Sequence, residues 1–142
     1  PLTLAIIDGM VVKVAEERYV IPTTAIRESL RPEKKQLSTV TRRGEMLSLR
    51  GEMLPLFRLN KLFELEGGHD DPTEALLVII GSSDNRCALL VDDLIEQQQV
   101  VIKSLGKIFS SVDGISGGAI MSDGKVALIL DTPGLVRMAV RN

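Results

Sequence analysis

Tryptophan is absent from the 142 residues, and the other aromatic residues are few, with one Tyr and three Phe. Proteins that bind single-stranded nucleic acid stack bases on aromatic side chains, so this composition disfavours that class. The net charge of −2, from 17 basic and 19 acidic residues, provides no general field that would attract nucleic acid or an anionic membrane. We therefore expect no nucleic-acid partner.

Cysteine and histidine occur once each, as Cys87 and His69. A single cysteine excludes an intramolecular disulfide and a cysteine-based metal cluster. His69 lies in a polar Gly-Gly-His-Asp-Asp segment, where a solvated loop residue is expected. Asp70-Asp71 and Asp92-Asp93 are adjacent pairs, and the two side chains of such a pair point in different directions in an extended chain. We therefore interpret them as turn or cap residues rather than as a catalytic acid and base. The sequence predicts no catalytic, cofactor-binding or metal site.

Long apolar runs are also missing, because no stretch of about 18 apolar residues occurs. The N-terminus lacks the basic-then-apolar order of a signal peptide. We expect a cytoplasmic location and no direct insertion into a membrane. The first residues, PLTLAIIDGMVVKV, read as a strand without a turn signal, in which Gly9 allows a close backbone approach. This pattern suggests a fragment whose domain is entered from an upstream domain.

Short apolar runs separated by turn residues indicate an all-β fold. Two short helices are expected at Phe57–Leu65 and Thr132–Val140, where Pro133 suits a first helical turn. The expected strands are Ala5–Val14, Arg18–Pro22, Glu45–Leu49, Glu52–Leu56, Ala75–Gly81, Arg86–Val91, Gln98–Lys103, Gly118–Ser122 and Lys125–Leu130.

Two halves of the chain resemble each other, which indicates an internal repeat. A glycine between two strand-like runs precedes a helix in each half, at Gly51 and at Gly124, and a second match aligns residues 18–22 with residues 86–90. Chance similarity among β segments is the alternative. From this pattern we expect a junction at 1–9, a first barrel at 10–66, a linker at 67–73, and a second barrel with a C-terminal helix at 74–142.

The loop Arg50-Gly51 predicts the register of a hairpin. It pairs Ser48 with Met53 and places leucines on one face, so Met46 and Met53 point away from the first core. Outward methionines suit an adaptable protein contact surface. The alternative is that they pack beneath a loop or against the other barrel.

Several segments in fixed order carry a resemblance to a known family: PLTLAIIDGMVVKV, EERYVIP, LRGEMLPLFRL, LLVDDLIEQQQVVIKSLGK and GGAIMSDGKVALILD. Together they resemble the CheW-like family, and within it the C-terminal regulatory domain of CheA-type chemotaxis histidine kinases. The resemblance implies a fold of two intertwined SH3-like, five-stranded β-barrels with short helices. It also implies a non-catalytic domain that binds CheW adaptors and chemoreceptor tips and transmits receptor state to the preceding kinase domain.

The resemblance also directs attention to particular residues. It places the family's adaptor-contacting positions on Thr23, Ser29, Val40 and Met53, and the outward face of the hairpin adds Met46. The junction residues Leu2, Thr3, Leu4 and Ala5 are expected to couple this domain mechanically to the upstream kinase domain, with completion of a barrel edge as the alternative. Two positions depart from the family pattern: Glu96 replaces a common glycine, and Asn60 stands where a Trp is frequent.

Two other functions remain open at this point. One is a stand-alone adaptor of the CheW type, which shares the fold but usually lacks the junction. The other is an orphan small β-barrel enzyme, which activity lost on carboxylate mutation would support.

Overall fold

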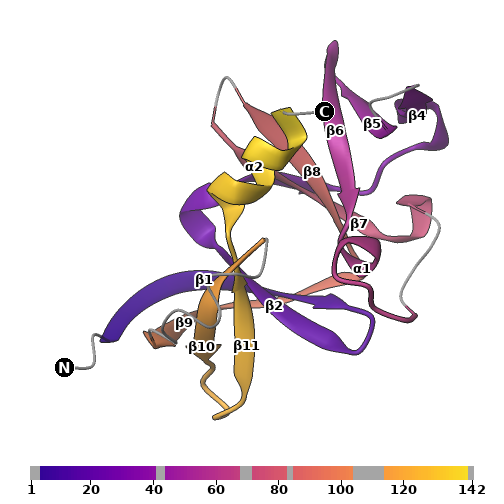
Figure 1. Ribbon diagram of the computed structural model, residues 1–142. Coiled ribbons are helices and arrows are strands. Elements are labelled where there is room, and N and C mark those ends of the chain that lie inside the picture. Colours follow the sequence, from indigo (N-terminus) through magenta and orange to yellow (C-terminus); the bar gives the residue numbers. More distant parts are fainter. Residues whose placement is uncertain (1–3, 41–43, 68–71, 83–84, 104–113, 141–142) are drawn as a thin grey trace.

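Strands dominate the computed structural model, which describes residues 4–40, 44–67, 72–82, 85–103 and 114–140 (Figure 1). The strands are β1 (Leu4–Val14), β2 (Glu17–Pro22), β3 (Ile26–Leu30), β4 (Leu37–Val40), β5 (Gly44–Leu49), β6 (Glu52–Arg58), β7 (Leu76–Gly81), β8 (Arg86–Val91), β9 (Asp93–Lys103), β10 (Ile115–Ile120) and β11 (Val126–Leu130). The helices are α1 (Leu59–Leu62) and α2 (Thr132–Val140), with short 3-10 turns η1 (Thr23–Ala25), η2 (Lys34–Gln36) and η3 (Pro72–Glu74). The predicted all-β class is confirmed.

The described strands form two separate sheets. One is a closed barrel with the order β1-β2-β11-β10-β9, called barrel 1 below. The other has the order β3-β7-β8-β6-β5-β4 and is called sheet 2. Barrel 1 has the five strands expected from the family resemblance. Sheet 2 has six, because β3 and β4 contribute separately as its two outermost strands.

The sheets do not follow the division at 10–66 and 74–142 expected from the sequence. Barrel 1 combines β1 and β2 with the distant strands β9 to β11, whereas sheet 2 is formed by β3 to β8. The chain therefore crosses between the sheets twice, after Pro22 and after Val91, and the expected linker falls inside sheet 2. Residues 68–71 of that linker, with His69, lie outside the described residues. The physical reason is the long β1–β9 pairing, which joins the first strand to a strand some ninety residues later in the chain.

The internal repeat agrees with this topology. In barrel 1 the hairpins β1–β2 and β10–β11 meet where β11 pairs in parallel with β2. In sheet 2 the hairpins β7–β8 and β5–β6 meet where β6 pairs in parallel with β8. A helix follows the second strand of the glycine hairpin in both cases, α2 after β11 and α1 after β6. Each repeat unit is therefore assembled from segments in both halves of the chain.

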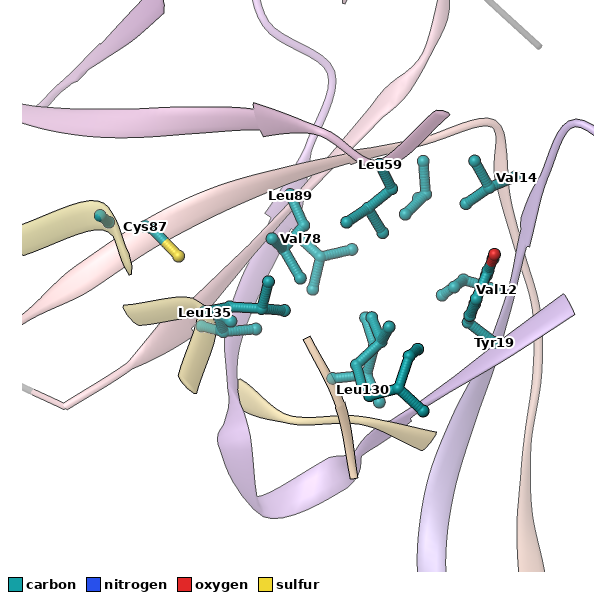
Figure 2. Packing of buried hydrophobic residues seen from close by; sticks show 14 residues of the cluster. Val12, Val14, Tyr19, Leu59, Val78, Cys87, Leu89, Leu130 and Leu135 are labelled. Atoms are coloured by element: carbon teal, nitrogen blue, oxygen red, sulfur yellow. The ribbon is translucent and has the colours of Figure 1, made fainter. Parts of the chain in front are cut away.

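A core cluster joins the two sheets (Figure 2). Val12 and Tyr19 enter it from barrel 1, Val78 and Leu89 from sheet 2, and Leu135 from α2. Each of these side chains is at most 4% exposed. Burial of a large apolar side chain contributes about 1.5–3 kcal/mol, so this shared core fixes the two sheets against each other.

Asp92 lies at the second crossing, between β8 and β9, and its hydrogen bonds support its interpretation as a turn residue. Its Oδ2 accepts a hydrogen bond from the backbone N–H of Ala15 at 2.7 Å, and its own N–H donates to the carbonyl of Lys13 at 2.8 Å. Ala15 has a φ of 55°, so this bond satisfies the amide of a residue in an uncommon conformation. Asp93 accepts a local bond from the N–H of Leu94 at 2.9 Å.

Two strands and part of a helix differ from the expectation. Strands β3 and β4 were not predicted, because they are edge strands in which no residue is fully buried and the apolar pattern is weak. The predicted helix at Phe57–Leu65 shrinks to Leu59–Leu62, because Phe57 and Arg58 continue β6 and pair with β8. Helix α2 has the predicted bounds.

Candidate protein docking surface

The β5–β6 hairpin has the predicted register, with Ser48 opposite Met53. Its inner face carries Leu47, Leu49, Leu54 and Leu56, all at most 8% exposed in the core of sheet 2. Opposed residues point to the same side of a sheet, so Met53 lies on the outer face. There its side chain is 49% exposed, whereas most apolar side chains of the hairpin are buried.

Met46 does not share this exposure. It is on the same outer face, but only 4% of the residue is exposed, so its expected place on the surface is wrong. Met46 lies on the middle strand of the β4–β5–β6 meander, between Ser38 and Pro55. Paired strands therefore flank Met46 on both sides. Met53 is nearer the hairpin tip, where such neighbours are fewer.

A shallow hollow of about 320 Å³ adjoins Met53. The start of β6, the start of β8 and the end of α2 line it, with Met53, Asn85, Arg86 and Ala139 among the lining residues. In Figure 1 the C-terminal end of α2 lies beside β6, below the tip of that strand. The hollow is the place where an apolar side chain of a partner could contact Met53 and reach both sheet 2 and the helix.

Two ion pairs stand beside this hollow. The guanidinium of Arg50, in the hairpin turn, pairs with Glu28 on β3, and Arg86 pairs with Glu52. The hydrogen bond from Arg50 lowers the pKa of Glu28, and the charges of Arg50 and Arg86 lower it further. Glu28 consequently keeps its negative charge to a lower pH than an isolated glutamate. The sequence provided no signal for these pairs, since 22 and 34 residues separate the partners.

A third ion pair lies at the other end of the hairpin strands. Arg58 Nε donates to Glu45 Oε1 at 2.7 Å, and Arg58 Nη2 donates to Glu45 Oε2 at 3.0 Å. The Arg58 side chain is 15% exposed. Glu45 and Arg58 share the strand faces of Leu47 and Leu56, so this bidentate pair closes one end of the core of sheet 2.

The remaining predicted contact residues lie on sheet 2 and in η1, the turn that precedes β3. Ser29 is exposed on β3, next to Glu28, and Val40 is 37% exposed at the end of β4. Thr23 is half-buried in η1, and its Oγ1 has no hydrogen-bond partner within the described part of the chain. The structure therefore places Ser29 and Val40 on the surface, and Thr23 largely beneath it.

Val40 and Met53 lie on one face of the meander but at opposite ends. Val40 pairs with Gly44 at the start of β5, and Met53 pairs with Ser48 four residues further along. At about 3.3 Å per residue and about 4.8 Å per strand, their backbones are roughly 16 Å apart. A single protein partner could span this distance, whereas a small ligand could not.

The junction residues are described in part. Leu2 and Thr3 lie outside the described residues. Leu4 begins β1 and pairs with Lys103, and Ala5 pairs with Ile102 in an exposed position. The described junction is therefore continuous with a strand of barrel 1, which the alternative of a barrel edge also requires.

The two departures from the family pattern have different surroundings. Glu96 is exposed on β9, accepts a bond from Gln98 Nε2 at 2.8 Å and pairs with Val11 beside a bulge. Asn60 is buried in α1, and its Nδ2 donates to the carbonyl of Gly67 at 3.3 Å. Neither residue lies among those lining the hollow at Met53.

Across residues 4–40, 44–67, 72–82, 85–103 and 114–140, no group of three or more His, Cys, Asp or Glu residues is placed to hold a metal ion. Cys87 is fully buried, and burial raises the pKa of its thiol to about 12, so it is not a thiolate at neutral pH. None of the helices in the described ranges is both long and apolar enough to cross a membrane.

Comparison with known proteins assigns the family. The model of the CheW-like domain matches residues 8–140. The chain belongs to the CheW-like domain family. Its fold is also similar to that of the scaffolding protein TtCheW from Thermoanaerobacter tengcongensis, with a TM-score of 0.71 and 18% identity over 89% of this chain and 90% of that one.

Curated relatives of this chain carry chemotaxis names. It is 47% identical over 135 residues to the chemotaxis protein CheA of Klebsiella aerogenes, a match that covers 95% of this chain and 21% of the relative. It is 40% identical over 139 residues to the sensor histidine kinase CheAY of Helicobacter pylori, covering 98% of this chain and 17% of that protein. The chain thus spans about a fifth of the length of the curated relatives it matches.

Proposed function

We propose that this chain is the non-catalytic regulatory and scaffold domain of a CheA-type chemotaxis histidine kinase in the cytoplasm. The observation that carries the proposal is the similarity over 95% of the chain to a fifth of a CheA protein. In this role the domain binds a CheW-type adaptor and the cytoplasmic tips of chemoreceptors. It couples their state to the kinase domain upstream in the same chain.

The adaptor surface in this proposal centres on Met53. An exposed methionine beside a shallow hollow, with ion pairs at its margin, has the apolar centre and charged rim that protein interfaces favour. Ser29 on β3 and Val40 on β4 extend the contact in this proposal to the two opposite edge strands of sheet 2. Thr23 is half-buried and Met46 is buried, so this proposal does not include them among the exposed contact residues.

The coupling role rests on the shared core. Val12 of β1 packs in the same cluster as Leu89 of sheet 2, so a change in the direction of β1 is not absorbed between the two sheets. Residues Leu2, Thr3, Leu4 and Ala5 are the connection to the upstream domain in this scheme. A stiff strand transmits a change of orientation, whereas a flexible linker would dissipate it.

Titration of the chain with a CheW-type adaptor tests the proposal. We expect saturable binding, together with species larger than one-to-one in sedimentation at high concentration. Two related barrels on each partner allow contacts that alternate and close into rings. Absence of binding by a folded chain would contradict the proposal, and a strict one-to-one complex at every concentration would contradict the alternating contacts.

A stand-alone adaptor is the second candidate, because the chain also covers 90% of the scaffolding protein TtCheW. The coding sequence upstream of Pro1 distinguishes the two candidates. Kinase domains encoded in the same reading frame support the regulatory domain, and a start codon immediately upstream supports the adaptor.

A further inference from the structure

A continuous apolar row crosses the outer surface of barrel 1. Ile6 on β1 pairs with Val101 on β9, Val101 pairs with Ile120 on β10, and Ile120 pairs with Val126 on β11. Directly opposed residues lie on the same side of a sheet, so the four side chains form one stripe. We call this stripe, Ile6, Val101, Ile120 and Val126, the barrel-1 row.

Exposure distinguishes the barrel-1 row from the rest of the described surface. Ile6 is 66% exposed, Ile120 40% and Val126 67%, and Val101 between Ile6 and Ile120 is half-buried. The other exposed large apolar residues lie outside the row and occur singly: Val40 on β4, Met53 on β6 and Ile95 on β9. Scattered apolar residues are ordinary on protein surfaces, whereas an uninterrupted group across four strands marks a contact surface.

The position of the barrel-1 row points to one occupant. Leu4 begins β1 and pairs with Lys103, only two residues before the pair of Ile6 and Val101. The described part of β1 therefore begins about 7 Å from the row. On its other side the row is bordered by the exposed polar pair Asp8 and Gln99.

The size of the row also favours a tethered partner. Four side chains of this kind present on the order of 300 Å², whereas a stable complex between separate proteins buries about 800 Å² on each partner. A domain joined by a short connection has an effective concentration in the millimolar range, so a small surface is sufficient. We infer that the barrel-1 row is the docking surface for the domain that precedes this chain, which rests on the proposed function.

Thiol labelling tests this inference in the longer protein that carries the chain. The variant Val126→Cys places a thiol in the barrel-1 row without altering β1, and the matched control Ile95→Cys places one on β9 outside the row. Cys87 gives little background, because it is fully buried. Labelled peptides are identified by mass spectrometry, and circular dichroism checks the fold of each variant.

The labelling rate is compared between the longer protein and the 142-residue chain alone. With an effective concentration of about 1 mM and a local Kd of about 0.1 mM, we expect labelling of the Val126→Cys variant to slow about tenfold in the longer protein. The Ile95→Cys control should label at the same rate in both. Equal rates for Val126→Cys in the two proteins would overturn the inference, as would equal slowing of both variants.

Two further measurements separate this inference from the proposed function. Slowing that increases with protein concentration would overturn the inference, because it would show that another molecule covers the row. Adaptor binding is measured on the same samples. If the adaptor binds but Val126→Cys is not protected, only the docking of the upstream domain is contradicted. If the adaptor does not bind, the proposed function itself is contradicted.

Discussion

Replacing Met53 with Asp should weaken adaptor binding without unfolding the protein. Met53 lies on the outer face of β6, beside Glu52 and the hollow that reaches α2. About half of the residue is exposed, so little of the core depends on its side chain. Substitutions at such surface positions usually change the free energy of unfolding by less than about 0.5 kcal/mol.

The expected loss of affinity follows from this exposure. Full burial of a methionine contributes about 1.5–3 kcal/mol, so burial of the exposed half contributes about 1 kcal/mol. The carboxylate of Met53→Asp would have to leave water beside Glu52, and an uncompensated polar group costs about 1–3 kcal/mol more. The sum, about 2–4 kcal/mol, corresponds to a Kd increased roughly 30-fold to 1,000-fold.

Calorimetric titration with the adaptor measures the change, and two controls define it. Met53→Leu should retain affinity within about tenfold, because an apolar side chain of similar volume remains. Met46→Asp should instead destabilise the fold by about 3 kcal/mol or more, because it introduces a charge at a position that is 4% exposed. Unchanged adaptor affinity of a folded Met53→Asp variant would refute the assignment of this surface.

Three further predictions concern the junction, the crossing between the sheets and the buried thiol. A few Gly and Ser residues inserted between Leu4 and Ala5 of the longer protein should reduce receptor-stimulated autophosphorylation while adaptor binding persists; undiminished receptor control would refute the coupling. Asp92→Ala should lower the free energy of unfolding by about 1–3 kcal/mol in urea, because the amide of Ala15 loses its acceptor, and an unchanged midpoint would contradict this. The thiol pKa of Cys87 is raised from 9.0 to about 12, so stability should fall as pH rises through that interval, and Cys87 should react with a thiol reagent at pH ~8 only after denaturation; rapid labelling of the folded protein would contradict it.

Local patterns were sufficient to predict most strands and one hairpin in detail. The Arg50-Gly51 turn determined the pairing of Ser48 with Met53, and both turn residues have positive φ, 48° and 85°. Gly9 was expected to permit a close approach, and a Cβ built there would overlap Val20. In both cases a glycine, which can be seen in the sequence itself, determines the local backbone geometry.

Long-range pairing could not be predicted in the same way. The assignment of β9 to the barrel of β1 depends on contacts between residues some ninety positions apart, which no local pattern reveals. The outward side of β10 and β11 was also unpredictable, because both sides of that hairpin are apolar. Only the pairing of Ile120 with Val101 and Val126 shows which side is exposed.

The exposure of Met46 and Met53 could not be predicted either, because it depends on which strands pair with the hairpin. Met46 and Met53 occupy equivalent sides of the hairpin, but the third strand, β4, was not expected and lies beside only one of them. Met46 is consequently buried and Met53 is not. An edge strand with few apolar residues thus determined which residue of the predicted site reaches the surface.

Autophosphorylation of the longer protein with and without this chain tests the central claim most directly. The assay compares basal activity with activity in the presence of the CheW-type adaptor and chemoreceptor tips. We expect the protein lacking the chain to retain basal autophosphorylation and to lose its response to adaptor and receptors. A response of the same size without the chain would contradict its role as the regulatory domain.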